Sequence, residues 1–174
     1  MKAIRKNLAV LVVVMGVTLF FTGALASADD NQGEPTLAGV WQVEVTLLSA
    51  CGQAGVVGHL PTLYTFTGDG KVIETPGTPL GLPGTLRTSP GLGTWQHDEG
   101  QQFSAVFRAF IINFGSPDPT KPDNTPAGSI TFTEAIELSQ DGDSFTSTGT
   151  ADFFNSNGNL FLHGCHTLAG MRLG

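Results

Sequence analysis

The chain has 174 residues, of which 40% are hydrophobic, and it carries 8 Lys and Arg against 15 Asp and Glu. Three of the basic residues and none of the acidic ones lie in the first 28 positions, so the rest of the chain has a formal net charge of −10. This negative charge repels phosphate backbones and anionic lipid surfaces. We therefore expect neither nucleic acid nor, once an N-terminal leader is removed, a membrane as a partner.

The first 28 residues have the three parts of a secretory signal peptide. A basic head is followed by an apolar run over 8–21 and by a small-residue cleavage motif, Ala26-Ser27-Ala28. The run is about 14 residues long, short of the ~20 that a membrane-spanning helix needs. We predict a signal peptide over 1–28, an N-terminal extension over 29–38 and one domain over 39–174, in a secreted or periplasmic protein.

After residue 38, apolar and polar side chains alternate with a period of two. In the first such segment, Trp41, Val43 and Val45 share one face, and Gln42 and Glu44 share the other. This alternation is typical of antiparallel strands that bury one face, whereas helical spacing is rare in this part of the chain. The eight strands that we predict span 39–49, 61–67, 71–75, 92–97, 101–112, 128–139, 143–154 and 159–172.

The connections between these strands alternate between short and long. The short turns lie at 68–70, 98–100 and 140–142. The long connections span 50–60, 76–91 and 113–127. In an up-and-down chain, every second connection falls at the same end of the sheet, so the short turns share one end and the long connections share the other. This layout predicts an all-β fold, an eight-stranded antiparallel up-and-down β-barrel with a flat base and an elaborated mouth.

Two cysteines, Cys51 and Cys165, remain after the signal peptide. Because exported proteins enter oxidising compartments, we predict a disulfide between them. The alternative is two separate buried thiols, which behave as small hydrophobic side chains.

Three features of the chain resemble the lipocalins and, more loosely, the wider calycin group. They are Gly39-Val40-Trp41 at the start of the first strand, eight strands in meander order, and Arg172 near the end of the last strand. The chain is also similar to an uncharacterised secreted bacterial lipocalin-like family.

The resemblance implies a barrel whose closed base holds Trp41, with the Arg172 cation packed over the indole. Antiparallel pairing of these two residues would place Cys165 opposite position 48, three residues from Cys51. A Thr-Asp-Tyr type of motif and a helix before the last strand, both common in lipocalins, are absent from the sequence. A β-sandwich or another small β-barrel is the alternative fold.

The segment His163-Gly164-Cys165-His166 contains three residue types that bind metals. On a strand, His163 and Cys165 share a face that His166 does not, and a disulfide would occupy Cys165, so we expect no metal site. The segment 155–159 lacks the carboxylates of a calcium loop and is better interpreted as a hairpin turn. Gly-x-Ser-x-Gly and phosphate-binding motifs are absent, so we expect no cofactor.

Glu134 is the most informative polar residue, because it shares a face with Phe132 on a predicted strand. A regular strand would direct this carboxylate into the barrel, where it must be hydrogen-bonded, paired or protonated. A bulge that turns it outward is the alternative. If Arg172 faces the inside of the barrel at its base, the alternation of the last strand directs His166 inward as well. A tyrosine on the second strand adds a hydroxyl. The candidate ligand contacts are therefore Glu134, His166, Tyr64 and Phe132.

The preferred hypothesis is a secreted binding protein that holds a small, mostly apolar molecule in the calyx, with specificity set by the long connections. An enzyme is the less favoured alternative: a calycin-type isomerase or cyclase using Glu134 and His166 as acid and base. This alternative requires the two side chains to converge within hydrogen-bonding reach in a cavity. A third hypothesis is a filled barrel that acts as a protein-interaction or inhibitor module.

Overall fold

The computed structural model describes residues 34–52, 55–77, 86–113 and 126–174, all within one compact unit, Gly33–Gly174. These residues form strands and no helix. The strands are β1 (Gly39–Leu48), β2 (Val56–Phe66), β3 (Lys71–Pro76), β4 (Leu86–Thr88), β5 (Gly91–Glu99), β6 (Gln102–Asn113), β7 (Pro126–Leu138), β8 (Ser144–Asn155) and β9 (Leu160–Leu173). The predicted signal peptide lies outside the described residues.

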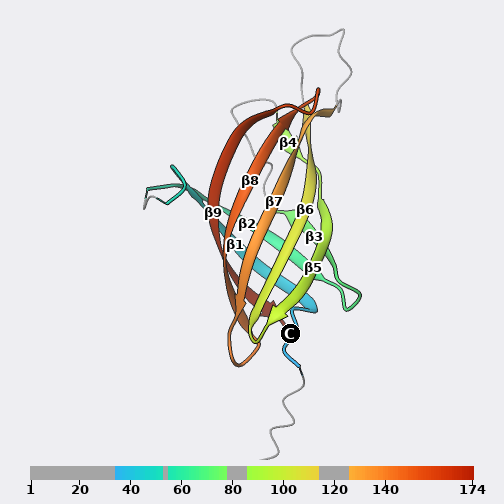
Figure 1. Cartoon of the computed structure of the whole chain (residues 1–174), viewed down its shortest axis with the longest axis vertical. Coiled ribbons are helices and arrows are strands. Elements are labelled where there is room, and N and C mark those ends of the chain that lie inside the picture. Colours follow the sequence, from blue (N-terminus) through green and yellow to red (C-terminus); the bar gives the residue numbers. More distant parts are fainter. Residues whose placement is uncertain (1–33, 53–54, 78–85, 114–125) are drawn as a thin grey trace, which may run out of the picture. The chain divides into compact units, whose positions relative to one another are not determined.

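Eight of the strands close into an antiparallel barrel. The sheet runs β6-β5-β3-β2-β1-β9-β8-β7, and pairing of β6 with β7 closes the ring (Figure 1). The prediction of an all-β, eight-stranded up-and-down barrel is therefore confirmed. The short strand β4 pairs with the far end of β6, beyond the last pair that β5 makes there. Sequence alternation missed β4 because three residues in a proline- and glycine-rich stretch are too few to show a period.

The three tight turns of the barrel lie at one end, which we call the base, as predicted. Each contains a glycine with positive φ: Gly70 (81°), Gly100 (54°) and Gly142 (77°). These values belong to the left-handed region, which side chains with a Cβ rarely adopt. The hairpin turn between β8 and β9 lies at the opposite end, the mouth, and has Gly158 at 79°.

The largest difference from the predicted strand boundaries is at β2, which begins at Val56 rather than at 61. The hairpin of β1 and β2 is consequently longer and extends away from the wall of the barrel (Figure 1). Pro61 lies inside β2, but β3 pairs with β2 only from Thr62 onward. The Pro61 carbonyl accepts from the Gly77 amide at 2.9 Å. A proline lacks only a backbone donor and is tolerated where the β2–β3 ladder ends, which explains why the strand continues through it.

The base is filled with aromatic side chains. Trp41, Phe66, Phe103 and Phe145 are each at most 2% exposed. The Trp41 ring meets Phe145 edge to face at 5.0 Å, and Phe66 meets Phe145 at 6.3 Å. Such aromatic pairs contribute about 0.5–1.5 kcal/mol beyond the area they bury. The base half of the interior is thus a packed core.

Arg172 lies across the bottom of this core. It pairs with Trp41 on the neighbouring strand, and its guanidinium carbon is 4.2 Å from the centre of the indole ring. Its nitrogens donate to three carbonyls: Gly142 at 2.8 Å, Ala38 at 2.7 Å and Thr36 at 3.0 Å. One side chain therefore joins β9, the β7–β8 turn and the segment before β1.

The glycine of the Gly39-Val40-Trp41 motif has a structural reason in this arrangement. Gly39 has a φ of 145°, and a Cβ at this position would lie 2.6 Å from the Arg172 guanidinium. Only glycine leaves room for the cation to reach the indole. The motif and the arginine are thus two parts of one contact.

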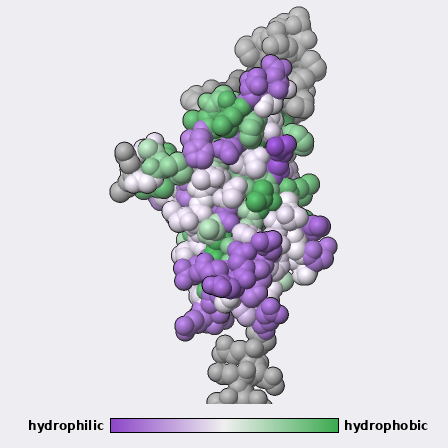
Figure 2. Space-filling model, in the orientation of Figure 1, coloured by the Kyte–Doolittle hydropathy of each residue, from purple (hydrophilic) through white to green (hydrophobic). Residues whose placement is uncertain are grey.

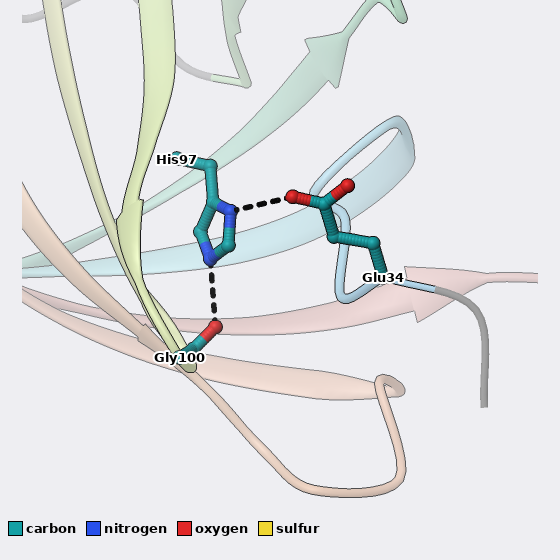
Figure 3. A network of polar contacts seen from close by, with 3 residues as sticks. All are labelled: Glu34, His97 and Gly100. Carbon is teal, nitrogen blue, oxygen red and sulfur yellow. Dashed lines mark hydrogen bonds and ion pairs between the residues drawn. The ribbon is translucent and has the colours of Figure 1, made fainter. Parts of the chain in front are cut away.

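A second polar contact holds the N-terminal segment at the base (Figure 3). His97 lies between Glu34, at 3.2 Å from its Nδ1, and the carbonyl of Gly100, at 2.8 Å from its Nε2. Its ring also packs on Phe103 at 4.7 Å. An ionised carboxylate and a carbonyl both accept, so both contacts are hydrogen bonds when both ring nitrogens carry protons.

Candidate functional site

Glu134 points into the barrel. It pairs with Ala105 of β6 on one side and with Gly149 of β8 on the other, without a register shift at either place. The alternative of a bulge that turns Glu134 outward is therefore wrong. The side chain is 1% exposed, so water cannot stabilise its charge.

Two buried side chains from neighbouring strands satisfy this carboxylate. The Nε2 of His166 on β9 lies 2.6 Å from Oε1, and the Ser147 hydroxyl on β8 donates to Oε2 at 2.7 Å. His166 is 3% exposed and Ser147 is 5% exposed. Each oxygen thus has a partner, which a buried carboxylate needs because an uncompensated charge in the interior costs several kcal/mol.

Gly149 makes the contact between Glu134 and His166 possible. It pairs with both residues, so it lies between them across three adjacent strands. A Cβ at this position would lie 2.5 Å from His166 Nε2 and nearer still to the Glu134 carboxylate. Sequence reasoning missed Gly149 and Ser147. Both residues lie an even number of positions from Phe145, so they share its inward face. This spacing was the signal that could have found them.

The two aromatic candidates lie beside this polar group. Phe132 stacks on Phe107 with centroids 4.8 Å apart and meets His166 edge to face at 6.0 Å. Tyr64 is 2% exposed and contacts the other side of this cluster, 5.5 Å from Phe107. The structure therefore brings Glu134, His166 and Phe132 together directly, with Tyr64 joined to them through Phe107.

The environment of Tyr64 keeps its hydroxyl neutral. Burial, followed by the negative charges of Glu134 and Glu74, raises the pKa of Tyr64 well above its usual value. A phenol in this position acts as a neutral hydrogen-bonding group rather than as a base.

Glu74 is a second inward carboxylate, and sequence reasoning missed it. Its Oε1 accepts from the Thr62 hydroxyl at 2.8 Å, and its Oε2 accepts from the Gly91 amide at 3.1 Å. Burial raises the pKa of Glu74 above its usual value, because the charged form loses its hydration. Alternation could not assign its face, since Val72 and Ile73 are both apolar; Val72 is the buried one.

Toward the mouth, some inward apolar side chains are buried and others are only half-buried. Ile111 and Ile130 are at most 6% exposed and belong to a second apolar cluster. Four other inward side chains remain half-buried: Val45, Leu47, Phe132 and Phe153. A Cβ at Gly164 would make only ordinary van der Waals contacts, 3.9 Å from the Ala151 carbonyl oxygen and from the Phe153 ring. Half-buried apolar side chains therefore line part of the interior toward the mouth.

The rim of the barrel near these half-buried side chains is apolar. At the start of β9, Leu160, Phe161 and Leu162 are between 51% and 61% exposed. Figure 2 shows apolar side chains gathered in the upper part of this face, near the mouth end of β8 and β9, and hydrophilic ones at the lower end. An apolar rim lowers the cost of bringing an apolar molecule to the opening.

The predicted disulfide is confirmed. Cys51 and Cys165 are joined with their Cα atoms 5.1 Å apart, which links the β1–β2 connection to β9 and closes a loop of sequence separation 114. The alternative of two separate thiols is wrong. His163 lies beside the bridge, and its Nδ1 is 2.6 Å from Asp152. In the disulfide neither sulfur is a thiolate, the form of cysteine that binds metals.

No protein-family model and no curated protein matches the chain. Among the described residues, no helix is long and apolar enough to cross a membrane. The likeness to a lipocalin thus rests on the closed antiparallel barrel and on the contact of Arg172 with Trp41.

Proposed function

We propose that this protein binds a small, mostly apolar molecule in the mouth half of its barrel. The observation that carries the proposal is a set of apolar side chains toward the mouth that point inward and yet stay half-buried. Trp41 and Phe145 at the base are at most 2% exposed, whereas Leu47, Phe132 and Phe153 also point inward and stay half-buried. Ligand cavities are typically apolar walls with a few placed polar groups, and the mouth half has this composition.

The Glu134–His166 pair forms the polar floor of the proposed site. Phe132 lies between this pair and the opening as an apolar contact surface, with its ring at the edge of the imidazole. The long connections at the mouth are proposed to set specificity, as loops on a rigid barrel commonly do. The disulfide is typical of a secreted or periplasmic protein, which is where we propose the protein acts.

An isomerase or cyclase is the second candidate, and one observation favours it. Glu134 and His166 converge at 2.6 Å, as an acid and base pair would. Against this, the two side chains are at most 3% exposed, and both carboxylate oxygens already have partners. A molecule in the mouth half would contact Phe132 before either group. Binding is therefore the better supported function.

The test is a titration with N-phenyl-1-naphthylamine, a neutral apolar probe that fluoresces on leaving water. We expect saturable binding to the wild type and a loss of at least tenfold in affinity for Gly164→Leu, which adds bulk to an inward position next to Phe153. The matched control is Ala169→Leu, which adds bulk to the exposed outer face of the same strand and should bind as the wild type does. Failure of the wild type to bind, or equal binding by Gly164→Leu, would contradict the proposal.

A further inference from the structure

The interior of the barrel carries more negative than positive groups. Two carboxylates, Glu134 and Glu74, point inward, and the basic side chain that the structure places beside them is His166, which contacts Glu134. Among the described lysine and arginine side chains, Lys71 and Arg108 are exposed on the outer face and Arg172 lies at the base. Glu74 therefore has no cationic partner among the described residues.

Glu74 differs from Glu134 in both its partners and its access. Its two hydrogen bonds come from neutral donors, the Thr62 hydroxyl and the Gly91 amide. A carboxylate has about four acceptor positions, so two neutral donors leave it capacity for more. The side chain is half-buried, and it lies two residues before Pro76, where β3 ends on the mouth side.

Aromatic rings flank this carboxylate. Tyr64 pairs with Glu74 across β2 and β3. The Phe107 ring and the Glu74 carboxylate lie on the same side of Gly91, since a Cβ there would be 2.7 Å from the ring and 3.1 Å from Oε2. A carboxylate next to aromatic rings is the combination that binds an ammonium group, through an ion pair and through attraction to the ring faces.

We propose that the ligand of the barrel is an amphiphilic amine, with its apolar body in the mouth half and its protonated nitrogen at Glu74. This inference rests on the proposed function and specifies the class of ligand. An ammonium group donates up to three hydrogen bonds and supplies the positive charge that the Glu74 environment lacks. Burial disfavours the ionised form of Glu74, and a bound cation would offset that effect by favouring the carboxylate.

The experiment compares three molecules that share one apolar chain and differ in charge: n-decylamine, n-decanol and n-decanoate. Each is used at pH 7, below its aggregation concentration, to displace N-phenyl-1-naphthylamine from the wild type. We expect the amine to displace the probe at a concentration at least tenfold lower than the alcohol, and the acid to be the weakest of the three.

Two variants locate the preference. Glu74→Gln should bring the amine within about threefold of the alcohol. Glu137→Gln removes the same charge from the exposed outer face of β7, so it controls for the long-range field and should keep the full amine preference.

The outcomes separate the two proposals. Equal displacement by all three molecules, or a preference for the acid, would overturn the amine inference while leaving the binding function standing. An amine preference that survives Glu74→Gln would overturn the assignment of the ammonium to Glu74. If the wild type binds neither the probe nor any of the three molecules, the proposed function fails and the inference fails with it.

Discussion

The two halves of the barrel interior differ in how their side chains are packed and buried. At the base, Trp41 and its aromatic neighbours exclude water, and the three donated bonds of Arg172 satisfy carbonyls from separate segments. Toward the mouth, Phe132 and Phe153 stay half-buried beside a smaller buried cluster, and the carboxylates of Glu134 and Glu74 point inward. The larger packed core therefore lies where the tight turns close the barrel. Half-buried apolar side chains lie nearer the opposite end.

The Glu134–His166 pair lies where the two halves meet, and its removal should have the largest effect on stability. His166→Leu would leave a buried carboxylate without its hydrogen-bonded basic partner, and the loss of one member of a buried pair typically costs about 3–5 kcal/mol. Because both side chains are at most 3% exposed, we expect changes at these residues to alter stability more than ligand affinity. The measurement is urea unfolding at pH 7.

The double variant Glu134→Leu/His166→Leu is the control for this prediction. Replacing both members of the pair by apolar side chains removes the carboxylate that His166→Leu leaves without its partner. Such replacements are often neutral or stabilising. We therefore expect the double variant to be more stable than His166→Leu. If His166→Leu unfolds at the same urea concentration as the wild type, the pair does not carry the structural role that its geometry indicates.

Arg172→Ala should have an intermediate effect, confined to the base. It removes a cation over the Trp41 indole, the packing of an aliphatic stem and three donors to carbonyls, so we expect destabilisation of about 1–3 kcal/mol. Probe affinity should remain within twofold of the wild type in the folded fraction, because the guanidinium lies at the opposite end from the proposed site. A variant of unchanged stability, or one that loses probe binding while folded, would contradict the assignment of stability to the base and of binding to the mouth half.

Alternation in the sequence predicted the faces of the strands that hold Trp41 and Glu134, because one buried face imposes a period of two. The inward position of His166 followed from its spacing from Arg172, which the lipocalin resemblance placed at the base. Pairing of Trp41 with Arg172, which the lipocalin resemblance implied, is also the register observed.

Other parts of the site depend on information that alternation does not contain. Glu74 follows two successive apolar residues on a short strand, so the sequence did not show whether it faces inward or outward. The role of Gly149 depends on the registers of β7, β8 and β9 together. The β7–β8 register follows from a tight turn, but the β8–β9 register shifts by a bulge near Phe153. Such a shift changes which residues meet across strands, and no local pattern in the sequence marks it.

The smallest expected effect concerns the pH dependence of stability at Glu74. Its pKa is raised in the folded protein, so the folded state holds its proton more tightly than the unfolded chain does. The stability that this group contributes is therefore fully present below its usual pKa of 4.5 and is lost as the pH rises through the raised value. Glutamine cannot titrate, so Glu74→Gln should gain stability relative to the wild type as the pH rises from 4 to 7. Urea unfolding of both proteins across this range measures the difference, with Glu137→Gln as the exposed control.

Because Glu74 is only half-buried, solvent screening keeps the effect on stability below those expected for the Glu134–His166 pair and for Arg172→Ala. A constant difference between Glu74→Gln and the wild type across this range would show that the carboxylate is well solvated in the folded barrel. The Glu74 site would then lack the desolvated charge that distinguishes the mouth half from the base.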